Sequence, residues 1–234
     1  MQYDFKQKLN KIDSQQYRNL RIPEIDWKIN EAYDIYVKSI AEPRSRNHLG
    51  FEGIQRSIDD LRTIVENDVE IPTSLIPGTN NYLAVIPEEY QHYVSAKIKM
   101  SKEGCGSRVG RALQKQHDDR HEESEFDKSS FEWKEVNIRF YTDGIKIFTD
   151  GTFTVESICL DFIRKHPYIH NAEDYIGGTY NLPDGTVLTG TQSCELPEHT
   201  HREIVDLAVL IATGDLQIPD YQIKQAKINI NKTI

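Results

Sequence analysis

The sequence predicts an α+β protein in which a helical bundle carries an inserted antiparallel β-rich layer and extended arms. Apolar residues repeat at helical spacing near the N-terminus and again over residues 201–213. Between these helices, residues 135–163 alternate apolar and polar side chains, a pattern typical of strands. Two other segments, residues 101–132 and 218–234, are too polar to form a core of their own and are predicted to be arms.

The first predicted helix covers residues 23–41. Pro23 suits a first-turn position, because the missing N–H is not needed there. Trp27 and Tyr36 lie off the apolar stripe, and we expect them to face a partner. The stripe itself consists of five residues at helical spacing: Ile25, Ile29, Tyr33, Val37 and Ile40.

A second helix is predicted over residues 51–67, with apolar residues alternating by three and four. This spacing favours antiparallel packing against the first helix. Residues 1–68 are therefore predicted to be a helical part, completed by residues 197–217. The stripe of the second helix consists of Phe51, Ile54, Ile58, Leu61 and Val65.

Residues 69–196 are predicted to be the β-rich part. Asp143-Gly144 and Asp150-Gly151 fit hairpin turns between consecutive strands of a meander. Asp184-Gly185 is a further turn candidate in the same layer. Gly104, Gly106 and Gly110 open the 101–132 arm and are predicted to form a flexible hinge.

The last predicted helix begins with a capping signature. Thr200 and Glu203 fit the capping box, in which the two side chains accept hydrogen bonds from backbone N–H groups at a helix start. Gly214 stands where such a helix ends. The apolar face between these limits is formed by Ile204, Leu207, Ala208 and Ile211.

Composition excludes several classes of protein. The 234 residues carry a net charge of −9, which argues against a surface dedicated to nucleic-acid binding. Three widely spaced cysteines offer no disulfide framework and favour a reducing compartment. The charged N-terminus does not fit a signal peptide. The longest apolar run, residues 207–212, is too short for a membrane span. We therefore expect a protein made in the cytoplasm that either stays there or leaves inside a particle.

His117 and His121 form the one cluster that could hold a metal. Residues at i and i+4 share a helix face, and the carboxylates between them could ligate a metal or act as a base. The pattern HDDRH departs from HExxH, however, and lies in a polar segment, which favours a solvated charged arm. His199 and His201 point apart at a spacing of two and are predicted to position the helix start instead.

Five segments, in order, resemble ring or adaptor proteins in the head-to-tail connector of crAss-like bacteriophages. The likeness covers most of the chain and rests on structural rather than catalytic motifs. The segments are IPEIDWKINEAYDIYVKSIAEP (22–43), IPEEYQHYVSAKI (86–98), DFIRKHPYI (161–169), LPDGT (182–186), and CELPEHTHREIVDLAV (194–209) followed by IPDYQ (218–222).

The resemblance implies a virion structural protein that acts by assembly and not by catalysis. The chain would be a subunit of an oligomeric ring below the portal, with twelve copies to match it. Implied partners are other copies of the chain, the portal protein and adjacent ring or tail proteins, without a membrane. DNA would pass through the lumen without specific binding, which suits an acidic surface.

The resemblance implies a chain made in the host cytoplasm and located in the virion, with no catalytic residue, cofactor or metal. The alternative is a phage metal-dependent enzyme that uses the His117/His121 cluster.

Overall fold

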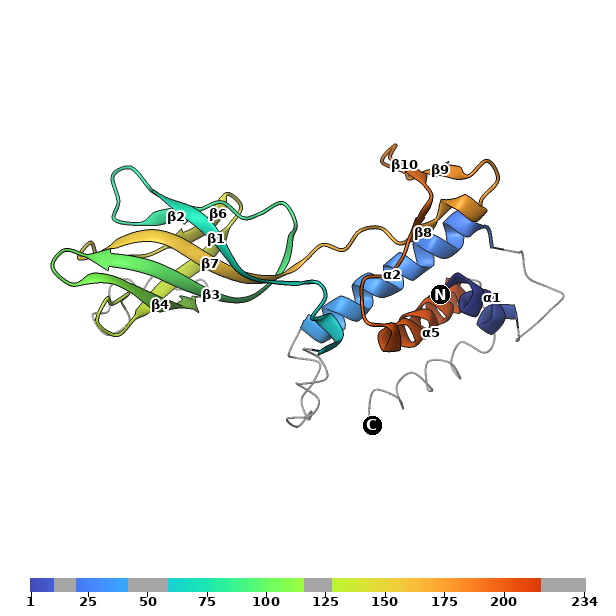
Figure 1. Ribbon diagram of the computed structural model, residues 1–234, viewed down its shortest axis with the longest axis horizontal. Coiled ribbons are helices and arrows are strands. Elements are labelled where there is room, and N and C mark those ends of the chain that lie inside the picture. Colours follow the sequence, from blue (N-terminus) through green and yellow to red (C-terminus); the bar gives the residue numbers. More distant parts are fainter. Residues whose placement is uncertain (11–19, 42–58, 116–127, 216–234) are drawn as a thin grey trace. The chain divides into compact units, whose positions relative to one another are not determined.

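The computed structural model describes residues 1–10, 20–41, 59–115 and 128–215 (Figure 1). The chain forms two compact units, and the second is inserted into the first. The described part of the first unit comprises residues 1–10, 20–41, 59–64 and 166–215. The second unit is residues 65–165. Residues 166–196, which the sequence analysis assigned to the β-rich part, thus belong with the helices.

The second unit is a closed β-barrel of seven strands. Around the barrel the strands follow the order β1-β2-β6-β5-β4-β3-β7, and β7 pairs with β1 to close it. Only β4 and β5 are parallel neighbours. The strands are β1 (Val65–Leu75), β2 (Tyr82–Ala84), β3 (Tyr90–Lys102), β4 (Gly106–Gln114), β5 (Glu135–Tyr141), β6 (Gly144–Ile147) and β7 (Thr154–Arg164).

The predicted fold class is therefore wrong. The β-rich part is a closed barrel, not a layer inserted into a helical bundle. Closure depends on the pairing of β1 with β7, where Ile71 lies opposite Ile158 and Val69 opposite Leu160. Alternation of apolar and polar residues is the same in an open layer and in a barrel, because it reports which face is buried and not which strand lies next to which.

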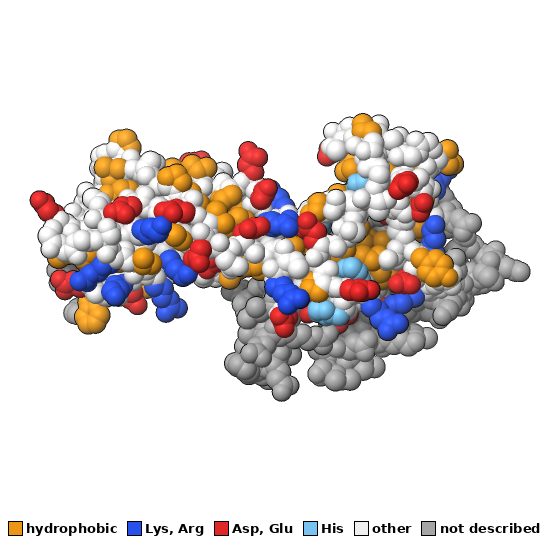
Figure 2. Space-filling view, viewed as in Figure 1, with side chains coloured by type: hydrophobic (Ala, Val, Ile, Leu, Met, Phe, Trp, Pro, Cys, Tyr) orange, Lys and Arg blue, Asp and Glu red, His pale blue; other side chains and the backbone are white. Residues whose placement is uncertain are grey.

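Inward-facing side chains fill the barrel. They come from every strand, and nine of them have no exposed surface: Ala84, Ile98, Met100, Val136, Ile138, Ile145, Ile147, Ile158 and Leu160. Outward, basic and acidic side chains are interspersed over the face in view (Figure 2). Lys97 and Lys99 of β3 form ion pairs with Asp68 and Glu70 of β1, across the intervening strand β7.

The predicted arm over residues 101–132 is also corrected. β3 continues to Lys102, and β4 follows after a tight turn in which Gly104 and Gly106 have φ values of 76° and 72°. Phe131 is 3% exposed and belongs to the barrel core. Residues 101–115 and 128–132 are therefore part of the barrel, and the rest of the predicted arm lies outside the described residues. Gly104 and Gly106, two of the glycines that suggested a flexible hinge, are those that the turn between the two strands requires, whereas Gly110 lies inside β4.

The predicted meander holds for one hairpin only. β5 and β6 pair in the expected antiparallel register, with Tyr141 opposite Gly144. β6 and β7 are not neighbours, since β6 lies between β2 and β5. The Asp184-Gly185 turn is present, with Gly185 at φ 88°, but it lies in the first unit rather than in the barrel.

The first unit contains three described helices, α1 (Gln2–Asn10), α2 (Ile22–Ala41) and α5 (Glu198–Asp215), and α5 packs against both of the others (Figure 1). The helix predicted over 23–41 is confirmed, and four residues of its stripe are buried: Ile25, Ile29, Tyr33 and Val37. Tyr36 is buried as well, and its hydroxyl donates to Asp60 at 3.2 Å, so its predicted partner-facing role is wrong.

Two other helix predictions need correction at their ends. Residues 59–61 are helical, but Val65 begins β1, so the helix predicted to reach residue 67 ends earlier; residues 51–58 lie outside the described part. α5 begins at Glu198, and the Thr200 hydroxyl donates to the Pro197 carbonyl at 2.8 Å. Thr200 is therefore inside the first turn and is not the N-cap. Gly214 lies within the helix.

Between β7 of the barrel and α5, the chain forms short strands and one turn of 3-10 helix. They pair as two small two-stranded sheets, β9 with β10 and β8 with β11. The elements are β8 (His170–Asn171), η2 (Ala172–Asp174), β9 (Thr179–Asn181), β10 (Val187–Thr189) and β11 (Thr191–Gln192).

Candidate binding pocket

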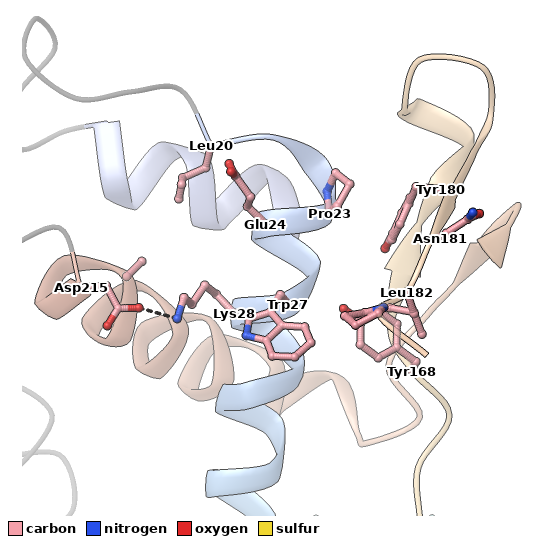
Figure 3. A pocket seen from close by; sticks show the side chains of 12 residues that line it. Leu20, Pro23, Glu24, Trp27, Lys28, Tyr168, Tyr180, Asn181, Leu182 and Asp215 are labelled. Atoms are coloured by element: carbon pink, nitrogen blue, oxygen red, sulfur yellow. Dashed lines mark ion pairs between the residues drawn. The ribbon is translucent and has the colours of Figure 1, made fainter. Parts of the chain in front are cut away.

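The first unit contains a largely apolar pocket of about 420 Å³ (Figure 3). One wall is the beginning of α2, including Pro23 and Trp27. The opposite wall is formed by Tyr168 and by the β9–β10 hairpin with Leu182. The end of α5 completes the lining. Trp27 is 51% exposed, so a large aromatic face is open to a bound group.

The turn between β9 and β10 places Leu182 and Pro183 at the pocket. The Leu182 N–H donates to the Thr186 carbonyl at 2.9 Å, which closes the turn. Asp184 accepts a hydrogen bond from the Thr186 N–H at 2.9 Å, and this bond lowers the pKa of the Asp184 carboxyl. The sequence LPDGT therefore forms a fixed turn that presents two apolar side chains.

An ion-paired lysine lies beside Trp27. Lys28 Nζ contacts Glu31 at 2.9 Å and also pairs with Asp215 at the end of α5. Burial disfavours the charge on Lys28, but the hydrogen bonds to Asp215 and Glu31 outweigh it and raise its pKa. The positive charge is thus compensated within the protein, which leaves the aromatic surface as the main binding feature.

A buried carboxylate supports the pocket from behind. Asp26 has no exposed surface and accepts hydrogen bonds from the Tyr180 hydroxyl at 2.8 Å and the Asn171 N–H at 3.1 Å. The Gln2 side chain also donates to it. Burial raises the pKa of Asp26, although these hydrogen bonds oppose the effect.

Two tyrosines of the pocket stay protonated at neutral pH. Burial, with the nearby charge of Asp26, raises the pKa of Tyr168 to about 12. Burial and the hydrogen bond to Asp26 raise the pKa of Tyr180 as well. The described residues that line the pocket include no Ser, Thr, Cys or His. The largely apolar and aromatic lining suits the binding of an apolar or aromatic group.

The histidines singled out in the sequence occupy different places. His117 and His121 lie outside the described residues. His199 Nε2 lies 2.7 Å from Asp60 Oδ1, and His201 Nε2 lies 2.9 Å from the Leu196 carbonyl. Both rings therefore fasten the beginning of α5. In the described part of the chain, no group of three or more His, Cys, Asp or Glu side chains could hold a metal ion.

Sequence reasoning missed this pocket and its support. The available signal was the pair Asp26 and Asn30, which stand four residues apart beside the apolar stripe of α2. Polar residues bordering a buried helix face at this spacing indicate a hydrogen-bonded attachment to another segment. The identity of that segment could not be found from the helix alone.

No protein-family model matches the chain, and no curated protein matches it. None of the helices in the described ranges is both long and apolar enough to cross a membrane.

Proposed function

We propose that this chain is a virion structural protein, a ring subunit in the head-to-tail connector of a crAss-like phage. It acts by assembly, binding other copies of itself, the portal protein and adjacent ring or tail proteins. One observation carries the proposal. Within each of the two units, the segments that resemble connector ring proteins, scattered from residue 22 to residue 209, contact one another.

The α2 segment contacts the segment 161–169. Asn30 Nδ2 donates to the Ile169 carbonyl at 2.7 Å, and the Ile169 N–H donates to Asn30 Oδ1 at 2.9 Å. His166 Nε2 lies 3.1 Å from Asp34, and its ring centroid lies 3.7 Å from that of Tyr33. Residues of these two resembling segments therefore form the contacts between α2 and residues 166–169, which follow β7 in the sequence.

The remaining resembling segments also make packing or pairing contacts within their own units. Segment 86–98 pairs with segment 161–169 along β3 and β7, and the Lys165 N–H donates to the Glu89 carbonyl at 2.7 Å. Segment 194–209 forms the first part of α5, which packs on α2. Segment 182–186 lies across the pocket from α2. Motifs that form the packing contacts within each unit support a structural role rather than a shared active site.

The experiment that tests this proposal is quantitative mass spectrometry on gradient-purified phage particles. The copy number of the chain is compared with that of the portal protein in the same particles. We expect a fixed ratio near one, because a ring that matches the portal has its symmetry. Absence of the chain from the particles would overturn the proposal, and metal binding at His117 and His121 would then be measured next.

A further inference from the structure

We propose that the pocket beside Trp27 binds residues 216–221 of a second copy of this chain. The inference rests on the proposed ring assembly and adds to it the contact that would join two subunits. The described part of the chain ends at Asp215, which itself lines the pocket. The sequence of the segment that follows, Leu-Gln-Ile-Pro-Asp-Tyr, has the chemistry that this pocket accepts.

Shape and chemistry favour this segment. A residue before proline prefers extended backbone, so the sequence Ile-Pro favours binding in an extended form. Grooves lined by aromatic side chains bind such segments. The pocket offers Trp27, Tyr168 and Tyr180 for this purpose. Its volume of about 420 Å³ falls within the range of roughly 300–1,000 Å³ that specific pockets occupy.

The net charge of the C-terminal segment also favours binding to a second copy of the chain. Residues 216–234 contain three lysines and a single acidic residue, whereas the whole chain has a net charge of −9. The cationic segment is therefore attracted to the acidic remainder of another copy. The three lysines, at positions 224, 227 and 232, follow the bound residues 216–221. Their charge steers association between copies, whereas the pocket itself is largely apolar.

The geometry of α5 favours a second copy over the chain's own segment. In Figure 3, Lys28 and Asp215 lie on one side of Trp27, and Tyr168 and Leu182 lie on the other. For a chain to fill its own pocket, its residues 216–221 would have to reverse direction after α5 to reach the far wall. Helices that end in a reversal commonly use Gly or Asn in the left-handed conformation. Residues 215–221 contain neither, while a segment from another copy enters without such a turn.

Binding can be measured with a fluorescently labelled synthetic peptide of residues 216–228. The receptor is the full chain carrying Ile218→Ser and Tyr221→Ser, so that its own segment does not compete. We expect saturable binding by fluorescence anisotropy, weakened at least about tenfold by Trp27→Ala, because central aromatic residues dominate such contacts.

The matched control is Trp133→Ala. The chain has two tryptophans, and Trp133 is 82% exposed on the barrel, outside the pocket. We expect this change to leave the affinity within twofold. Absence of binding, equal effects of the two Trp substitutions, or equal binding of a scrambled peptide would overturn the proposal. The last result would mean that charge alone accounts for the interaction.

Mixing two full-length variants tests whether the contact joins copies. One variant carries Trp27→Ala and Leu182→Arg, and the other carries Ile218→Ser and Tyr221→Ser. At concentrations tenfold above the measured peptide Kd, we expect sedimentation to show association only in the mixture. No association in the mixture would overturn binding between copies. The unaltered chain at the same concentration should associate as well, and an unaltered chain that stays monomeric, as when each chain fills its own pocket, would also overturn it. Particle copy number is measured separately, so failure of this contact and failure of the ring proposal are distinguished.

Discussion

Asn30 and Ile169 exchange two hydrogen bonds, from the Asn30 amide to the Ile169 carbonyl at 2.7 Å and from the Ile169 N–H to Asn30 Oδ1 at 2.9 Å. Both residues are buried. The amide side chain thus takes the place of a neighbouring strand and holds the backbone of the segment that follows the barrel against α2. This attachment also sets the position of Tyr168 in the pocket wall.

Asn30→Ala leaves the N–H and carbonyl of Ile169 without these partners. We expect a loss of about 2–4 kcal/mol in the free energy of unfolding of the first unit, because buried backbone groups without partners are costly. Urea unfolding followed by circular dichroism measures it. The control is Asn67→Ala at an exposed position on β1, which should stay within about 0.5 kcal/mol of the unaltered chain. Equal losses in the two variants would contradict the role given to Asn30.

Gly144→Ala tests the close approach of β6 to β2. A Cβ atom at Gly144 would lie 2.3 Å from the Ala84 carbonyl oxygen, and the φ of this residue is 147°. We expect barrel stability to fall by about 3 kcal/mol or more, since backbone must shift to accept the methyl group. Thermal unfolding of the barrel provides the measurement.

The control for that change is Gly104→Ala in the β3–β4 turn. Its φ is 76°, but nothing lies within 4 Å of the added Cβ, so only the left-handed backbone is strained. We expect a cost of about 1–2 kcal/mol. A cost for Gly104→Ala as large as that for Gly144→Ala would show that backbone conformation, and not the Ala84 contact, accounts for the effect.

The raised pKa of Asp26 predicts that the free energy of unfolding depends on pH. Its folded-state pKa is raised above the ordinary value of 3.8, so over the window between these two values the folded chain holds a proton that the unfolded chain has lost. Stability from this group is therefore highest below pH 3.8 and falls as pH rises through the raised pKa. Relative to Asp26→Asn, we expect the unaltered chain to lose at most about 1.4 kcal/mol per pH unit across the window.

The measurement is urea unfolding of both chains at several pH values between 3 and 7. A difference in unfolding free energy that stays constant, or one that grows in favour of the unaltered chain as pH rises, would contradict the raised pKa. Tyr180→Phe serves as a second variant. It removes one hydrogen bond that lowers the pKa of Asp26 and should shift the window to higher pH.

A chain shortened to end at Asp215 tests the role of the C-terminal segment in assembly. The buried residues of α2 and α5 end at Thr213, so the free energy of unfolding should stay close to that of the full chain. We expect fewer copies per portal in particles when the shortened chain replaces the full one, measured by mass spectrometry. An unchanged ratio would show that residues 216–234 are not needed for incorporation.

The parts of the fold that sequence predicted correctly depend on neighbours in the chain. The apolar spacing of Ile25, Ile29, Tyr33 and Val37 identifies α2 because residues three and four apart share one helix face. Asp143-Gly144 identifies the β5–β6 hairpin because the turn fixes the register of its own two strands. The turn at Asp184-Gly185 follows from the same local chemistry.

The wrong predictions involve partners far away in the sequence. The capping box fits Thr200 and Glu203, yet the helix starts earlier and the Thr200 hydroxyl bonds to Pro197. Tyr36 was placed outside the core because its partner, Asp60, comes from another segment. The polar stretch containing β4 resembles an arm until its pairing with β3 and β5 is known.

By itself, the sequence determined the helix over residues 23–41, the β character of residues 135–163, two turns and an acidic chain. Only the tertiary structure decided that the strands close into a barrel, that residues 166–196 join the helices, and that a pocket forms beside Trp27. The physical reason is the range of the interactions. Periodicity and turn preference act over a few residues, whereas β1–β7 pairing and the attachment of Asn30 to Ile169 join segments that chain order does not relate.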